Sequence, residues 1–212
     1  MRALVAVVIL FALVIAAAAV GFFTAPPRHD ADAFASPPAR PPAAVAPAGP
    51  RAGKVLPVAA AMKELDLIRP SRTKAAEDFT LRTPHGGTFR LSEHRGKVVM
   101  VNFWATWCPP CLEEMPAMER LYRQHRAAGF TLVAVSVDAD PAKVTPFLTS
   151  HRLTFPVALD PRMDLANSYA VRALPSSFIV DSAGNLAALA IGPRHWDSNA
   201  AHSLVEGLAR QP

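Results

Sequence analysis

One mostly apolar run of seven residues, Val98–Trp104, constrains the fold of this chain more than any other feature of the sequence. Such a run, rich in β-branched residues, is typical of a central strand that is buried on both faces of its sheet. A second run of this kind covers residues 131–137, and the stretch from about residue 109 to 126 between them has the pattern of a helix. This order of elements predicts an α/β domain.

The rest of the pattern extends this domain in both directions. Two short strands, 79–81 and 88–91, flank the turn residues Pro84-His85-Gly86-Gly87 and predict a β-hairpin ahead of the central strand. Further along we expect a helix at 141–151, a short strand at 155–159, a helical turn at 165–169, a hairpin of strands 177–180 and 186–191, and a last helix at 198–210. Strands that alternate with helices in this way predict a mixed sheet with helices on both faces.

The N-terminal third has a different composition. Residues 3–23 form an unbroken run of 21 apolar and small residues, close to the roughly 20 that a helix needs to cross a bilayer. This length favours a retained anchor, whereas the alanines at 16–19 would suit the exit of a cleaved signal peptide. With either role for this run, we expect the remainder of the chain to be exported.

Residues 25–72 are rich in proline and alanine, a composition that buries little surface and that proline holds extended. We therefore predict an anchor or signal segment over 1–24, a linker over 25–72 with a short helix possible within 55–68, and a folded domain over 73–212. Residues 1–72 hold 8 Lys/Arg against 4 Asp/Glu, and residues 73–212 hold 14 against 13. The domain is thus close to neutral and lacks the basic stripe of a nucleic-acid-binding protein; we expect no nucleic-acid partner.

The chain has two cysteines, Cys108 and Cys111, three residues apart. With no other thiol to pair with, they do not belong to a disulfide framework. Nor do they indicate a zinc site, which needs a second Cys or His pair at ligand spacing. The C-x-x-C spacing favours redox cycling, while a static local disulfide remains the alternative at this point.

The pair lies where the buried strand gives way to a helix. Unsatisfied N–H groups and the positive end of the helix dipole stabilise an anion there, so a thiol at this position ionises more readily. We assign Cys108 as the nucleophile, at the exposed start of the helix, and Cys111 as the thiol that resolves the mixed disulfide. Pro110 has no N–H to offer the Cys108 sulfur, which favours a reducing dithiol; alternatively, the two prolines only stiffen the turn.

Several motifs together give the chain a family resemblance over about residues 76–210. The segment Val101-Asn102-Phe103-Trp104-Ala105-Thr106-Trp107-Cys108-Pro109-Pro110-Cys111 is similar to the active-site strand of the TlpA/ResA family of membrane-tethered thioredoxin-like proteins. The segments 96–99, 112–116, 171–181 and 192–196 also resemble that family. The resemblance implies a thioredoxin-like fold with an added N-terminal hairpin, thiol:disulfide oxidoreductase activity, and no metal or cofactor beyond the Cys108–Cys111 pair.

The resemblance also implies roles for residues around the pair. Pro175 matches the proline that the family holds in the cis form beside the cysteines, and the backbone of Leu174 would offer strand-like hydrogen bonds to a partner chain. Trp107 is expected to flank the pair on an apolar docking surface. Trp104 is expected in the core. For Trp196 we expect surface packing.

Glu114 is the expected proton carrier. It follows Cys111 by three residues, so the two lie on adjoining parts of one helix face. Partial burial would raise its pKa and let it take the Cys111 proton during exchange. Thioredoxin carries a buried aspartate where this chain has Asn102, and this departure leaves proton transfer to Glu114 or to water.

The function that follows from the resemblance is reduction of exported protein disulfides. The implied substrates are apocytochrome c or copper-assembly proteins of a respiratory oxidase. The implied electron source is a membrane donor of the DsbD/CcdA type. The expected location is the bacterial inner membrane, with a single N-terminal anchor and the domain in the periplasm.

Three other functions remain open from the residues. A copper-binding assembly chaperone would use the same two thiols, since sulfur ligands suit Cu(I). A protein that oxidises the thiols of its partners would be distinguished from a reductase by its reduction potential. A peroxidase is disfavoured, because that class has Thr or Ser three residues before its reactive cysteine and this chain has Ala105 there.

Overall fold

A computed structural model describes residues 53–211. The predicted anchor or signal segment, 1–24, and the part of the predicted linker up to residue 52 lie outside this range. Among residues 53–211, no helix is both long enough and apolar enough to cross a membrane.

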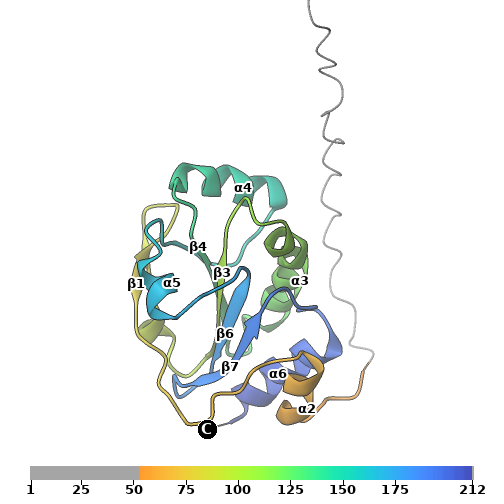
Figure 1. Cartoon of the computed structure of the whole chain (residues 1–212). Helices are drawn as coiled ribbons and strands as arrows, with labels where there is room; N and C mark the ends of the chain where they lie inside the picture. The colour runs from red at the N-terminus through yellow and green to blue at the C-terminus, as the bar shows by residue number, and fades with distance from the viewer. Residues whose placement is uncertain (1–52, 212) are drawn as a thin grey trace, which may run out of the picture. The chain divides into compact units, whose positions relative to one another are not determined.

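Five strands form the central sheet (Figure 1). In spatial order they are β5 (Val157–Leu159), β4 (Phe130–Ser136), β3 (Val98–Trp104), β6 (Ser176–Val180) and β7 (Leu186–Ile191). The pairs β3–β4 and β4–β5 are parallel, whereas β3–β6 and β6–β7 are antiparallel. The predicted mixed sheet is confirmed, with the predicted central strand at its centre.

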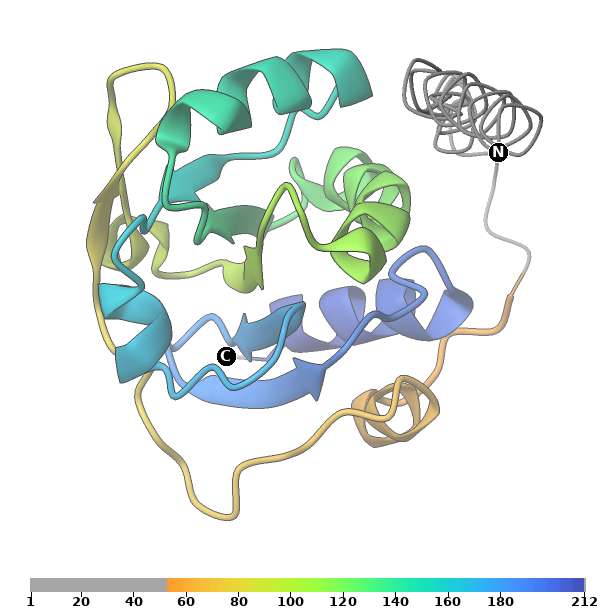
Figure 2. The same ribbon diagram turned by 45° about the horizontal axis from the view of Figure 1, so that its top comes forward.

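Helices cover both faces of this sheet (Figures 1 and 2). On one face lie α3 (Pro109–His125), α4 (Val144–His151) and α6 (Asn199–Ala209); the 3-10 turn η3 (Pro141–Lys143) leads into α4. On the other face lie α5 (Asp164–Ser168) and the predicted hairpin, formed by β1 (Thr80–Arg82) and β2 (Thr88–Arg90) and followed by η2 (Leu91–His94). The sequence therefore predicts these strands and helices, apart from η2, to within a few residues.

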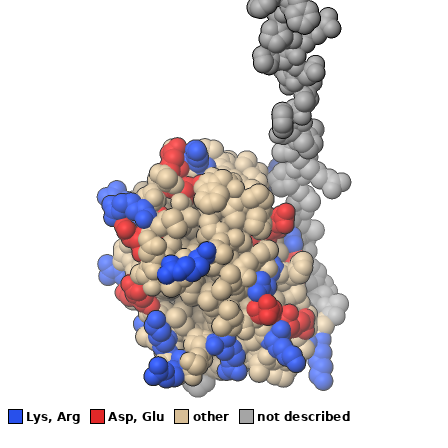
Figure 3. Space-filling model, viewed as in Figure 1, with Lys and Arg blue, Asp and Glu red and all other residues tan. Residues whose placement is uncertain are grey.

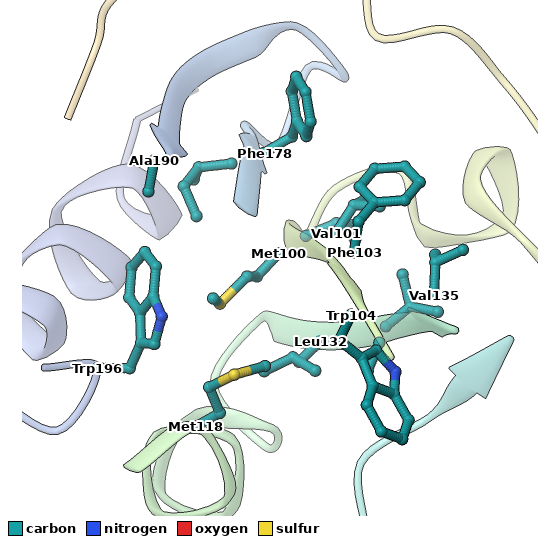
Figure 4. Close-up of a cluster of buried hydrophobic side chains, with 14 of the residues drawn as sticks. Met100, Val101, Phe103, Trp104, Met118, Leu132, Val135, Phe178, Ala190 and Trp196 are labelled. Carbon is teal, nitrogen blue, oxygen red and sulfur yellow. The ribbon is translucent and has the colours of Figure 1, made fainter. Parts of the chain in front are cut away.

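The core divides into two sides because successive residues of β3 point to opposite faces. All seven residues of β3 are buried. Met100 points toward α3 and α6, where Figure 4 shows it near Met118 and Trp196. Phe103 points the other way, and its ring contacts Phe178 at a centroid distance of 5.8 Å. Asn102 shares a face with Met100, so this polar residue faces α3.

The packed domain begins before residue 73, inside the range that the composition assigns to the linker. The helix α2 (Val58–Glu64) packs on α6, with Ala61 and Met62 buried. After α2, Ile68 and Leu189 of β7 exchange backbone hydrogen bonds of 2.8 and 2.9 Å. The proline-rich composition ends at about residue 57, and the apolar residues after it are buried by an element at the far end of the chain.

On the face shown in Figure 3, Lys and Arg side chains are scattered among Asp and Glu with uncharged surface between them. This is the distribution expected from the near-neutral charge of residues 73–212.

A test of the α2 contact uses Gly207 of α6, because a Cβ there would lie 2.4 Å from Cγ2 of Val58. In an exposed helix, Gly→Ala stabilises by up to about 1 kcal/mol. We expect Gly207→Ala instead to lower the free energy of unfolding by about 1–2 kcal/mol, because Val58 is stiff at χ1 and the contact is overpacked. Val58→Ala in the same chain should restore the loss, as measured by urea unfolding in a double-mutant cycle. A stabilised Gly207→Ala protein would show that α2 does not pack there.

Candidate redox site

Cys108 is the N-cap residue of α3, with extended backbone angles of φ −99° and ψ 98°. The first two helical residues are Pro109 and Pro110, which have no N–H groups. The next two amides, of Cys111 and Leu112, donate to the carbonyl oxygen of Cys108 at 3.1 and 3.2 Å. The first turn of α3 therefore offers the Cys108 sulfur fewer amide donors than an ordinary helix N-terminus does.

Cys108 and Cys111 form a disulfide, with an S–S distance of 2.04 Å and a Cα–Cα distance of 5.3 Å. Cys108 retains 4% of its surface exposed and Cys111 none. Cys108 is thus more enclosed than its predicted place at an exposed helix start implies, because it lies in a groove. It is still the more accessible of the two cysteines, as the assigned order of attack requires.

This groove has a volume of about 410 Å³ and runs between the start of α3 and the segment before β6. Its lining is mainly apolar and comprises Trp107, Cys108, Pro109, Met163, Val171, Arg172, Ala173 and Leu174. The Leu174–Pro175 peptide bond is cis, as the resemblance implies. Trp107 is 67% exposed, an unusual state for a tryptophan, whereas Trp104 is fully buried. Trp107 and Leu174 therefore lie with Cys108 around one surface.

Glu114 lies one turn beyond Cys111 and is 4% exposed. Three donors bind its carboxyl group: Asn102 Nδ2 reaches Oε1 at 2.8 Å, and the Arg194 backbone N–H and Trp196 Nε1 reach Oε2 at 3.1 and 2.9 Å. Burial raises the pKa of Glu114 to about 7, and these three hydrogen bonds oppose that rise because they favour the ionised form. Glu114 can therefore bind and release a proton near neutral pH.

Asn102 connects Glu114 to the neighbouring strand. Its Nδ2 also donates to Ser177 Oγ of β6 at 2.9 Å, while its buried Oδ1 has no hydrogen-bond partner in the described part of the chain. A protonated Glu114 needs an acceptor for its O–H. A half-turn of the Asn102 amide would supply Oδ1 for that purpose, so this polar cluster can accommodate both protonation states.

A second buried carboxylate supports the loop that leads to Cys108. Asp138, 2% exposed, accepts hydrogen bonds from the backbone N–H of Thr106 at 3.0 Å, from the Thr106 hydroxyl at 2.6 Å and from the Ser136 hydroxyl at 2.8 Å. These contacts tie the loop after β3 to the end of β4. They position Trp107 and Cys108 without touching either.

The sequence alone misses three residues of this site. Trp196 is 1% exposed and binds Glu114, so the expectation of surface packing is wrong for this residue. Ser177 and the backbone of Arg194 have no sequence signal of their own. The segment 192–196 shows only the family resemblance, and nothing in its residue types indicates that it folds over α3.

Within residues 53–211, no three His, Cys, Asp or Glu side chains are grouped so that they could hold a metal ion.

The fold and the cysteine pair define a thioredoxin-fold thiol:disulfide oxidoreductase. The chain belongs to the AhpC/TSA family, whose model matches residues 73–189. It is 39% identical over 117 residues to the thiol-disulfide oxidoreductase ResA of Geobacillus kaustophilus, a match that covers 55% of this chain and 67% of that protein.

Solved structures agree. A putative thiol:disulfide interchange protein DsbE from Chlorobium tepidum has 35% identity and a TM-score of 0.56, over 58% of this chain and 87% of that one. StoA from Bacillus subtilis has 29% identity and a TM-score of 0.50, over 55% and 89%. The sequence-based assignment to ResA-like thioredoxin-fold oxidoreductases is thus confirmed.

The pKa of Glu114 gives a test by pH-dependent stability. This carboxyl group titrates near 4.5 in the unfolded chain and near 7 in the folded protein. Its contribution to the free energy of unfolding is therefore fully present below pH 4.5 and is lost as the pH rises through 7. We expect the oxidised protein to lose roughly 3 kcal/mol of unfolding free energy from this group between pH 4.5 and 8.

Urea unfolding at several pH values would measure this effect as the difference between the wild type and Glu114→Gln, in which other titrating groups cancel. The exposed Glu113 offers a matched control, since Glu113→Gln should keep the slope of the wild type. Equal slopes for all three proteins would show that Glu114 has an ordinary pKa.

Proposed function

We propose that this protein reduces disulfides of exported partner proteins. The observation that carries the proposal is the difference between the two cysteines at the start of α3. The more accessible one, Cys108, lines an apolar groove, and the enclosed one, Cys111, lies a turn from a carboxyl group with a pKa of about 7. The relatives named above as thiol-disulfide oxidoreductases support the reaction type.

The reaction proceeds in two exchanges. The Cys108 thiolate attacks one sulfur of the partner disulfide, the S–S bond breaks, and the other partner sulfur leaves as a thiolate. Cys111 then gives its proton to Glu114 and attacks the Cys108 sulfur, which releases the second partner thiol. The partner gains two electrons, and the protein is left with the Cys108–Cys111 disulfide. A membrane electron donor of the DsbD/CcdA type would reduce it again.

The groove is the proposed docking surface. A partner chain would lie extended along Leu174 and the cis Pro175, with backbone hydrogen bonds to Leu174. Trp107 would cover an apolar side chain next to the partner cysteine, because it is largely exposed and lines the same groove as Leu174.

The partners and the location are proposals of the same kind. We infer that the partners are apocytochrome c or copper-assembly proteins, because the sequence resembles the TlpA/ResA family. We place the domain in the periplasm, with residues 1–24 as a single anchor in the bacterial inner membrane, because of the apolar run at 3–23. In that oxidising compartment a reducing dithiol needs a dedicated electron source.

Trapping tests the proposal. Cys111→Ser cannot resolve the mixed disulfide, so we expect it to accumulate covalently linked partners in cells, which non-reducing gels and mass spectrometry would detect. Cys108→Ser is the matched control and should trap none. The reduced wild-type protein should also reduce insulin disulfides. Tight Cu(I) binding by the reduced protein together with intact insulin would favour the copper chaperone instead, and rapid turnover of hydroperoxide would favour a peroxidase.

The role of Glu114 has a kinetic signature. We expect Glu114→Gln to slow the release of a partner from a preformed mixed disulfide by about 10²-fold at pH 8, because the base that takes the Cys111 proton is gone. The inflection near pH 7 should disappear, while the first attack by Cys108 stays as in the wild type. Stopped-flow measurement of the two steps would show this, with Glu113→Gln as control. An unchanged pH profile of the second step would assign the proton to water.

A further inference from the structure

The loop between β7 and α6 contacts both halves of the redox site. We call residues 192–196 the acid-binding loop, since two of the three donors to Glu114, the Arg194 N–H and the Trp196 indole, belong to it. At its start, the N–H of Gly192 donates to the carbonyl oxygen of the cis Pro175 at 2.8 Å. A shift of this loop would therefore move the partners of Glu114 and the support of the groove together.

The side chain of Arg194 holds this loop against the segment that follows α2. Its Nε donates to the carbonyl oxygen of Leu65 at 2.7 Å, and Nη2 donates to the carbonyl oxygen of Asp66 at 3.0 Å. Nη1 donates to three carbonyl oxygens at the end of β7 and the start of the loop, those of residues 191, 192 and 193, at 3.1, 3.2 and 2.9 Å. Five backbone carbonyls thus converge on one guanidinium group, whose side chain is 17% exposed.

This arrangement requires arginine. The guanidinium group is a rigid fork with five N–H donors, all of its nitrogens point to acceptors here, and it is always charged. The contact with the Asp66 carboxylate, at 3.2 Å, is of little weight by comparison, because that side chain is 96% exposed. The contact of Arg194 with the N-terminal segment therefore rests mainly on its hydrogen bonds to the carbonyl oxygens of Leu65 and Asp66.

We propose that Arg194 is a positioning residue for Glu114, and that the segment from α2 to Ile68 is in consequence a working part of the redox site. The guanidinium group fixes the acid-binding loop to this segment, and the loop in turn presents two donors to the carboxyl group that serves Cys111. This inference rests on the proposed role of Glu114 in thiol exchange and adds to it the residues that set its proton affinity.

The direction of the effect follows from the groups that face Glu114. From β3 it meets the neutral Asn102, which is bound to the neutral Ser177 of β6; from the acid-binding loop it meets Trp196 and Arg194. Arg194 is the charged group among them, and its positive charge and its N–H both lower the pKa of Glu114 against the effect of burial. A loosened loop would remove donors from the ionised form, so the pKa would rise and less base would be present at neutral pH.

The experiment compares three variants of the full chain. Arg194→Met removes the fork and the charge at similar length, Arg194→Lys keeps the charge and loses the fork, and Asp66→Asn removes only the exposed carboxylate. The pKa of Glu114 would be measured by carbon NMR titration in the oxidised protein, and the pH midpoint of partner release in single turnovers of the reduced one.

We expect Arg194→Met to move both midpoints upward by roughly one pH unit, Arg194→Lys to move them upward by less, and Asp66→Asn to leave them as in the wild type. Should Arg194→Met fail to fold, the shift in Arg194→Lys decides the question. A loss of rate that is equal at every pH, or an unshifted Glu114 titration, would overturn the proposal. The NMR titration needs no turnover, so an inactive wild type would refute the proposed function and leave this inference open to its own test.

Discussion

A carboxyl group kept inside the domain, one turn from an enclosed sulfur, is the constraint on which the rest of this site depends. Burial alone would hold Glu114 protonated, and three hydrogen-bond donors alone would hold it ionised. Burial has the larger effect and the donors limit it, so the pKa of Glu114 is raised from its usual 4.5 to about 7. Every element that touches the carboxyl group therefore sets how easily the proton moves, and these elements are β3, α3 and the loop before α6.

These opposing effects explain why a strand at the centre of the sheet carries a polar residue. Asn102 is fully buried in β3, where its neighbours along the strand, Val101 and Phe103, are apolar. An aspartate at this position would place a second carboxyl group beside Glu114, and mutual repulsion would keep one of them protonated. The amide instead gives one donor to Glu114 and one to Ser177 without adding charge. With Asn102 in this place, β3 binds Glu114 without adding a second carboxyl group beside it.

The features that sequence can predict here are those whose signal is local. The strand Val98–Trp104, the helix from Pro109 and the spacing of Cys108, Cys111 and Glu114 all lie within one stretch of chain, so pattern and period are sufficient to place them. Trp196 meets Glu114 across 82 positions, and the helix α2 is buried against α6, which lies near the other end of the chain. Such contacts depend on how distant elements pack, and no property of the tryptophan or of the alanine-rich helix by itself indicates them.

The two cysteines differ in what surrounds them, and in the proposed function this difference sets the direction in which the pair works. At Cys108, two prolines remove amide donors from the first turn of the helix, so a thiolate there is less stabilised than at an ordinary helix N-terminus. A less stabilised thiolate gives up its electrons more readily, which favours the reducing direction. Cys111 has no exposed surface and needs a base within the protein, which is Glu114 in the proposed mechanism. A site that weakens the anion at one sulfur and provides a proton acceptor for the other is better suited to releasing a reduced partner than to oxidising one.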